Sequence, residues 1–148
     1  MESQFVAFGS IATTRVGSVA NELVNLVLIS RQLEEYFECE MAKSGDAALC
    51  SFDLAHMLES PYSLICLDIM MPGMDGLQVL KHIREAENAL VVPPDQEAKV
   101  MIISSDAAHT TILKSFFDCG ASSYLTKPIN RKKMIQELMT LNLINLRQ

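Results

Sequence analysis

The stretch from Tyr62 to Gly76 reads Tyr-Ser-Leu-Ile-Cys-Leu-Asp-Ile-Met-Met-Pro-Gly-Met-Asp-Gly, and it decides the fold. Its apolar run, Leu64–Leu67, ends on a carboxylate, Asp68. A short apolar run bounded by turn residues is typical of a strand buried on both faces of a parallel sheet. We therefore predict a strand over Tyr62–Leu67, with Asp68 at its carboxyl end, where open α/β sheets bind their ligands.

The residues that follow Asp68 predict a loop, because Pro72, Gly73 and Gly76 interrupt regular structure. A helical pattern begins only at Leu77, so capping of the next helix does not explain the carboxylate. A carboxylate held at the mouth of a sheet is suited to act as a nucleophile or as a metal ligand.

Length and composition describe an ordinary globular chain. Its 148 residues favour a single domain, with 49% hydrophobic and 20% charged residues. The formal net charge of −6 argues against a general nucleic-acid or anionic-membrane binder. The four cysteines show no metal-like spacing, which favours reduced thiols in a cytoplasmic protein. We expect neither a secretory signal nor a membrane span, since a span needs about 20 apolar residues.

Strand and helix patterns alternate along the rest of the chain. The predicted strands are Arg15–Ala20, Glu38–Ala42, Tyr62–Leu67, Lys99–Ser104 and Ser123–Thr126. The predicted helices begin at Asn21 or Glu22, cover Gly45–Glu59, Leu77–Ala86 and Ala108–Cys119, and follow an Asn130 cap to about Leu141. This alternation implies a flavodoxin-like, doubly wound α/β fold, with a five-stranded parallel sheet in the order 2-1-3-4-5.

The amino-terminal segment is the least informative part of the sequence. Phe5–Phe8 is compatible with a strand, but the glycine, serine and threonine residues after it are typical of a loop. Gly17 and Ser18 are poor strand formers within the predicted first strand. We expect residues 1–14 to form an extension and residues 15–148 to form the domain.

Several polar residues fall at predicted strand ends and should converge with Asp68. Ser104 ends the fourth strand, Lys127 follows the fifth, and Asn21-Glu22 follow the first. Taken singly, Ser104 is an ordinary strand end and Lys127 a surface charge. Together they suit a phosphoryl group on Asp68, because an ammonium neutralises its oxygens and a hydroxyl donates a hydrogen bond to them.

The Asp68–Gly76 string closely resembles the phosphoacceptor segment of response-regulator receiver domains. Val100–Ser105 is similar to the strand that carries the family's switch hydroxyl, and Tyr124–Pro128 to the segment that carries its switch aromatic residue and lysine. The resemblance covers roughly Arg15 to Leu143. It implies that Asp68 accepts the phosphoryl group, that Ser104 and Lys127 contact it, that Tyr124 is the switch residue, and that the Met70 carbonyl ligates Mg²⁺.

The first predicted strand departs from the family pattern. Receivers usually carry two adjacent acidic residues there, whereas the matching positions hold Ala20 and Asn21, with Glu22 next. Mg²⁺ is typically held by one or two carboxylates together with phosphate oxygens. Asp68 with Glu22, or with the Asn21 amide oxygen, is therefore expected to bind Mg²⁺ weakly or not at all.

The expected function is that of a single-domain response regulator, a phosphoacceptor rather than an enzyme. Asp68 would receive phosphate from a histidine kinase or a phosphotransfer protein, and the output would be contact with a downstream protein. The missing acidic pair motivates an alternative, a pseudo-receiver that acts as an interaction module without Mg²⁺-dependent phosphorylation. An aspartyl-nucleophile phosphatase is less favoured, because Met70 stands where a second Asp is needed.

Overall fold

The computed structural model describes residues 5–10, 31–33, 36–42, 45–69, 74–104, 110–126 and 129–144. Residues 31–33 are helical. The named elements, in chain order, are β1 (Phe5–Ser10), β2 (Glu38–Ala42), α2 (Gly45–Met57), β3 (Leu64–Ile69), α3 (Met74–Ala89), the 3₁₀ turn η1 (Pro94–Gln96), β4 (Lys99–Ser104), α4 (Thr110–Asp118), β5 (Ser123–Thr126) and α5 (Arg131–Thr140).

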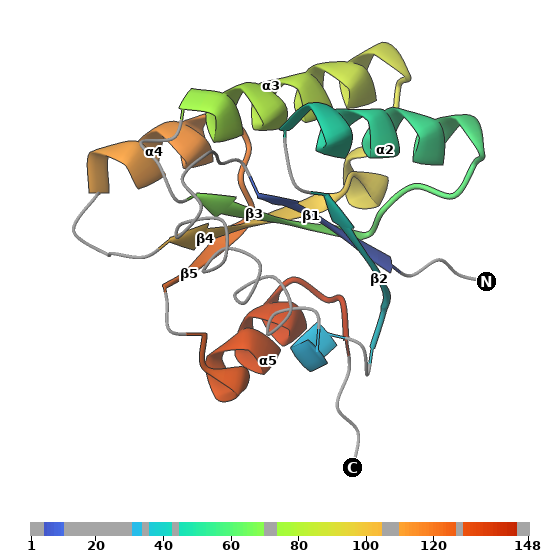
Figure 1. The fold of residues 1–148 in the computed structure, drawn as a ribbon. Helices are drawn as coiled ribbons and strands as arrows, with labels where there is room; N and C mark the ends of the chain where they lie inside the picture. The colour runs from blue at the N-terminus through green and yellow to red at the C-terminus, as the bar shows by residue number, and fades with distance from the viewer. Residues whose placement is uncertain are drawn as a thin grey trace.

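The strands form one five-stranded sheet in the order β2-β1-β3-β4-β5, and every neighbouring pair is parallel. This order confirms the predicted fold. Helices α2, α3 and α4 lie on one face of the sheet, and α5 with the 31–33 piece lies on the other (Figure 1). Within the described ranges, no helix is long and apolar enough to cross a membrane.

The central strands are apolar throughout because both of their faces are buried. Along β3, Ile65 and Leu67 pack into the core beneath α2 and α3, whereas Leu64 and Cys66 pack into the core beneath α5. All four side chains are at most 2% exposed. The period of two along a strand therefore sends alternate apolar residues into opposite cores. Leu33 of the 31–33 piece belongs to the α5 core, as the predicted first helix required.

The first strand is not where it was predicted. The strand between β2 and β3 is Phe5–Ser10, and Arg15–Ala20 lies outside the described residues. The physical reason lies in the side chains, because Phe5–Phe8 holds two aromatic residues and a β-branched one, whereas Gly17 and Ser18 have low strand propensity. Part of the segment expected to be an extension thus occupies a central position in the sheet.

The helix predicted over Leu77–Ala86 is longer in the structure, since α3 begins at Met74 and ends at Ala89, so Gly76 is helical and not part of the predicted loop. The other described elements lie close to their predicted positions. Strands β2, β4 and β5 have the predicted bounds, and β3 begins and ends two residues later than predicted. Gly120 follows α4 with φ +105°, a conformation that suits a glycine C-cap. The Asn130 side chain accepts a hydrogen bond from the Lys133 N–H at 3.2 Å and caps α5.

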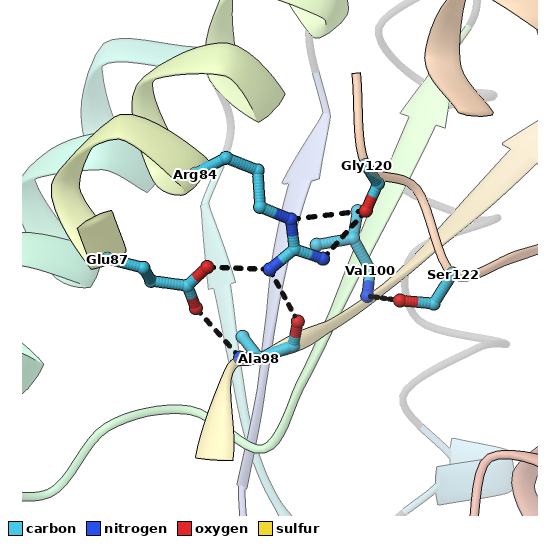
Figure 2. Close-up of polar contacts among 6 residues, drawn as sticks. All are labelled: Arg84, Glu87, Ala98, Val100, Gly120 and Ser122. Carbon is cyan, nitrogen blue, oxygen red and sulfur yellow. Dashed lines mark hydrogen bonds and ion pairs between the residues drawn. The ribbon is translucent and has the colours of Figure 1, made fainter. Parts of the chain in front are cut away.

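A pair of charged side chains on α3 ties together three segments at the amino end of β4 (Figure 2). Arg84 Nη1 donates to Glu87 Oε1 at 2.6 Å and to the Ala98 carbonyl at 2.9 Å. Arg84 Nε and Nη2 both donate to the Gly120 carbonyl, at 3.1 and 2.8 Å. Glu87 Oε2 accepts from the Ala98 N–H at 2.8 Å. We call this arrangement of Arg84, Glu87, Ala98 and Gly120 the amino-end clamp.

The clamp satisfies the charge of a buried carboxylate. The Glu87 side chain is 1% exposed, and a buried carboxylate is tolerated when a partner charge and hydrogen bonds surround it. Beside the clamp, Ser122 Oγ accepts from the Val100 N–H at 3.0 Å, and the Ser122 N–H donates to the Val100 carbonyl at 2.8 Å. The start of β4 and the turn before β5 are therefore joined by side chains as well as by the sheet.

Candidate functional site

The candidate site lies at the carboxyl ends of the strands, opposite the amino-end clamp. The strand register pairs Asp68 of β3 with Ser10 of β1, and Ile69 with Ser104 of β4. Ser104 in turn pairs with Thr126, the last residue of β5. Asp68 itself pairs with Ile103 of β4, so Ser104 lies one residue further along the neighbouring strand, about 4.8 Å away across the ladder, at the same carboxyl edge of the sheet.

Ser104 is the predicted site residue whose surroundings are described most fully. It ends β4, and its side chain is 6% exposed. Asp68 is the second-last residue of β3, whereas the sequence predicted it directly after the last strand residue, Leu67. The other predicted residues, Asn21, Glu22, Met70 and Lys127, lie outside the described residues. Lys127 follows Thr126 directly in the sequence.

Tyr124, the predicted switch residue, lies on β5 with its ring partly in solvent. It is 42% exposed, whereas its neighbours Ser123 and Leu125 are buried. The ring of Phe117 from α4 packs edge-on against it, with the ring centroids 6.1 Å apart and an interplanar angle of 84°. This geometry is one that aromatic pairs prefer.

Phe117 is a residue that the sequence interpretation missed. It belongs to the pair Phe116-Phe117 in α4, of which Phe116 is 1% and Phe117 40% exposed. One member of such a pair must leave the buried face, because adjacent residues on a helix point about 100° apart. The sequence therefore held a signal for an outward aromatic ring, but no signal that its partner would be Tyr124.

The start of α3 is packed closely against α4. Gly76 lies in the first turn of α3, and a Cβ atom there would come within 3.2 Å of the Phe116 Cζ atom. Phe116 and Leu113 of α4 belong to the same core as Leu80 of α3. This packing sets the distance between the helix that follows the Asp68 loop and the helix that follows Ser104.

The described strand ends carry a single carboxylate, that of Asp68. The last residues of β1, Gly9 and Ser10, add no acidic group, and the described ends of β4 and β5 carry hydroxyl groups only. Within the described residues, no three His, Cys, Asp or Glu side chains gather in a way that could hold a metal ion. Among the described strand ends, Asp68 is therefore the carboxylate that could hold a divalent cation, together with backbone carbonyls and oxygens brought by the phosphoryl group.

The comparison with known families agrees with this arrangement of strand ends. The family model for the response regulator receiver domain matches residues 18–139. The chain belongs to this family. The match begins downstream of β1, so the boundary predicted between residues 14 and 15 stays a prediction.

Individual relatives cover most of this receiver chain. It is 30% identical over 115 residues to the chemotaxis protein CheY of Treponema pallidum, covering 76% of this chain and 74% of CheY. It is 34% identical over 116 residues to the transcriptional regulatory protein TctD of Salmonella typhimurium, covering 76% of this chain but 48% of TctD. The chain therefore spans about half the length of that regulator.

Solved structures support the receiver fold. One is the receiver domain of the Saccharomyces cerevisiae response regulator Ssk1, crystallised with the histidine phosphotransfer protein Ypd1. It superposes on this receiver with a TM-score of 0.63 at 15% identity, and the match covers 94% of this chain and 90% of that chain. At this identity, the similarity shows the shared fold.

Proposed function

We propose that this receiver accepts a phosphoryl group on Asp68 from a phosphohistidine of a histidine kinase or phosphotransfer protein. The observation that supports the proposal is the placement of Asp68 at the carboxyl edge of the sheet, one residue out of register with the buried Ser104 on the neighbouring strand. One Asp68 carboxylate oxygen attacks phosphorus while the P–N bond to the imidazole breaks. The imidazole leaves with the electron pair of that bond and takes up a proton, and an aspartyl phosphate remains.

The residues around Asp68 have separate tasks in this transfer. The Lys127 ammonium, which follows β5, neutralises charge on the phosphoryl oxygens. The Ser104 hydroxyl donates a hydrogen bond to one of these oxygens after transfer. Both groups bind the product more strongly than the free carboxylate, because the phosphoryl group brings additional negative charge and acceptor oxygens.

Magnesium supplies charge screening between the Asp68 carboxylate and the anionic phosphodonor. Asp68, the Met70 carbonyl, and Asn21 or Glu22 are the residues proposed to hold it. Because the described end of β1 carries no acidic residue, we expect weaker Mg²⁺ binding than in receivers with an acidic pair. The screening of charge between Asp68 and the phosphodonor by Mg²⁺ is then the feature in which this receiver differs most from its family.

The proposed output is a change in a protein-binding face. Ser104 moving toward the phosphoryl group leaves room for Tyr124 to turn inward, and this changes the surface formed by α4, β5 and α5. The present position of Tyr124, 42% exposed and packed on Phe117, suits the state before phosphorylation. The downstream partner is a protein that distinguishes the two positions of this ring.

The upstream partner is proposed from the fold and from the chemistry of Asp68. The Ssk1 receiver, which shares this fold, has been crystallised with a histidine phosphotransfer protein. A phosphohistidine is a suitable donor for a carboxylate nucleophile, since the protonated imidazole is a good leaving group. A kinase or phosphotransfer protein is therefore the class of donor to test.

A pseudo-receiver is the second candidate function. The observation that favours it is the lack of an acidic residue in β1, and the sequence-based match to the family likewise finds no acidic pair, with Ala20 and Asn21 at the matched positions. Such a protein would bind its partners through a fixed surface and would not need a phosphoryl group. The two functions differ in whether Asp68 becomes phosphorylated.

Intact-mass spectrometry after incubation with acetyl phosphate separates the two functions. We expect the native protein to gain one phosphoryl group, more slowly without Mg²⁺, and Asp68→Asn to gain none. Asp95→Asn, which replaces an exposed Asp in η1, is the matched control and should react like the native protein. A native protein that gains no phosphoryl group across a Mg²⁺ series supports the pseudo-receiver, and an adduct on Asp68→Asn excludes Asp68 as the acceptor.

The metal proposal has its own variant. Restoring the acidic pair with Ala20→Asp and Asn21→Asp should increase the thermal shift caused by millimolar Mg²⁺ and speed the reaction with acetyl phosphate. Stabilisation by a ligand that binds only the folded state grows with ligand concentration over Kd, so weak binding gives a small shift. A large Mg²⁺ shift in the native protein would show that its own residues already complete the site.

A further inference from the structure

A cavity lies between the edge strand β2 and the helix α2, away from Asp68. Its volume is about 430 Å³, and its lining includes Cys39, Glu40, Leu54, Ala55, Leu58 and Tyr62. β2 stands at one end of the strand order, so the cavity lies at an outer strand of the sheet. Tyr62 precedes β3, and six residues of extended chain, about 20 Å, separate it from Asp68.

The polar part of the cavity is a carboxylate held by a tyrosine. The Tyr62 hydroxyl donates a hydrogen bond to Glu40 Oε1. Burial first, and then the hydrogen bond and charge of Glu40, raise the pKa of Tyr62 above its ordinary value, so the hydroxyl keeps its proton. Among the residues described by the structure, no cation pairs with Glu40, which is exposed and keeps its Oε2 atom for another donor.

The apolar part of the cavity continues outside it along α2. Leu54, Met57 and Leu58 are 53%, 79% and 67% exposed, and they stand at helical spacing i, i+3 and i+4. Met57 does not line the cavity, so the apolar surface is larger than the cavity itself. The opposite stripe of the same helix, Ala48, Phe52 and Ala55, is buried in the core.

The described residues that line the cavity include one charged side chain, that of Glu40. The sequence from residue 44 to residue 80 holds no Lys or Arg. It holds the exposed acidic residues Asp46, Asp53 and Glu59, in addition to Glu40 on β2. Of these, Asp53 lies 3.5 Å from His82 of α3. Glu40 is therefore the carboxylate to which a cation of a partner would bind in this cavity.

We infer that this cavity and the Leu54–Met57–Leu58 ridge form a docking site for a basic amphipathic helix of a partner protein, with one arginine placed against Glu40. The arginine guanidinium donates to Glu40 Oε2, and its alkyl chain packs between Leu54 and Leu58. Apolar side chains at i, i+3, i+4 or i+7 of the partner cover the ridge. A protein segment fits better than a small cation, because a small cation leaves the ridge exposed. The site lies outside the proposed phosphoacceptor machinery.

The probe for this site is a fluorescein-labelled 16-residue peptide in an Ala/Gln background. It carries leucines at i, i+4 and i+7 and one central arginine. The matched control peptide has citrulline in place of arginine, which keeps the shape and removes the charge. Fluorescence anisotropy with the unphosphorylated protein measures Kd for both peptides. We expect the arginine peptide to bind more tightly by about fivefold, the size of a partly exposed charge pair.

Two pairs of protein variants locate the binding. Glu40→Gln keeps an acceptor for the Tyr62 hydroxyl and should weaken the arginine peptide about fivefold while leaving the citrulline peptide unchanged. Its control is Glu85→Gln on α3, an exposed residue with the same change in net charge, which should alter Kd less than twofold. Leu54→Gln should weaken the binding of both peptides. Its control is Leu90→Gln, at a leucine after α3 that is 57% exposed, and it should weaken the binding of neither.

The inference is overturned by any of several results. The first is an equal loss of affinity for the arginine peptide in Glu40→Gln and Glu85→Gln. The second is an equal Kd for the arginine and citrulline peptides, and the third is no saturable binding of the arginine peptide. Phenylguanidine binding as tightly as the peptide would also overturn it, since a small cation would then be sufficient. Circular dichroism of each variant checks that the fold is unchanged, and the acetyl phosphate reaction of Asp68 is measured separately, so either result can fail alone.

Discussion

The two ends of the parallel sheet are built for different purposes. At the amino end of β4, Arg84 and Glu87 bind backbone groups of two other segments and bury a charged pair. At the carboxyl end, the sheet places Asp68 and Ser104 on neighbouring strands, one residue out of register. Side chains at one end hold the elements together, whereas side chains at the other end are placed for chemistry. Substitutions at the amino end should therefore change the free energy of unfolding, and those at the carboxyl end should change reactivity.

The largest loss of stability should come from disrupting β1, because this strand runs from the amino end of the sheet to its carboxyl end. Ala7→Pro removes a backbone N–H from a strand that pairs with β2 and β3, and it should lower the free energy of unfolding by at least about 3 kcal/mol. Gly17→Pro is the control, since residue 17 is outside β1, and it should cost much less. Urea denaturation followed by circular dichroism measures both.

If Gly17→Pro lowers the free energy of unfolding more than Ala7→Pro does, the original sequence prediction of the first strand is restored. If Gly17→Pro unfolds the protein and Ala7→Pro does not, the first strand is Arg15–Ala20 and residues 1–14 are an extension. The pair thus also tests the predicted domain boundary.

Removing the cation of the amino-end clamp should have the next largest effect. Arg84→Met leaves the Glu87 carboxylate buried without its partner charge, and we expect a loss of about 3 kcal/mol in the free energy of unfolding. Lys114→Met breaks the exposed pair with Asp118 on α4, at 3.2 Å, and should cost less than about 0.5 kcal/mol. Similar losses of unfolding free energy for the two variants would mean that the amino-end clamp stabilises the protein no more than a surface ion pair does.

A substitution in the turn beside the clamp should cost less. Gly120 has φ +105°, and an added Cβ atom would come within 2.9 Å of Arg84 Nε. Gly120→Ala should therefore lower the free energy of unfolding by about 1 to 2 kcal/mol through backbone strain and this clash. In the Arg84→Met background the same substitution should cost less, because the clash with Nε is gone. Equal costs in both backgrounds would assign the whole effect to the backbone.

The smallest effect concerns pH and also belongs to the amino end of the sheet. The pKa of Tyr62 is raised by burial and then by Glu40, so the folded state keeps a proton that the unfolded chain releases above about pH 10. Stability from this group is complete below pH 10 and is lost as pH rises further, by up to about 1.4 kcal/mol per pH unit. Tyr62→Phe should flatten this part of the stability profile. An unchanged slope would show that other groups cause it.

The parts of the fold that sequence predicted well are those specified by short-range signals. The apolar runs of β3 and β4, the glycine after α4 and the Asn130 cap each depend on neighbouring residues. The position of Asp68 near the carboxyl end of its strand followed from such a run, although β3 continues two residues past Leu67 to Ile69.

The parts that sequence missed depend on contacts between distant residues. Arg84 and Glu87 stand three apart on α3 and resemble an ordinary exposed helix pair, yet the carboxylate is buried against Ala98. Nothing local indicates that Gly120, 36 residues away from Arg84, supplies the acceptor. The first strand was missed for a related reason, since two segments competed for one place in the sheet and only strand pairing decides between them.

The central position of β1 has a consequence for biosynthesis. Val6 of β1 pairs with Leu64 of β3, so β1 leaves the ribosome 58 residues before that partner is made. At about 5 to 20 residues per second, this delay is roughly 3 to 12 s. During this time the exposed N–H and C=O groups of an aromatic-rich strand are open to mispairing with other chains. A ribosome pause before β3 should therefore increase aggregation more than one after it.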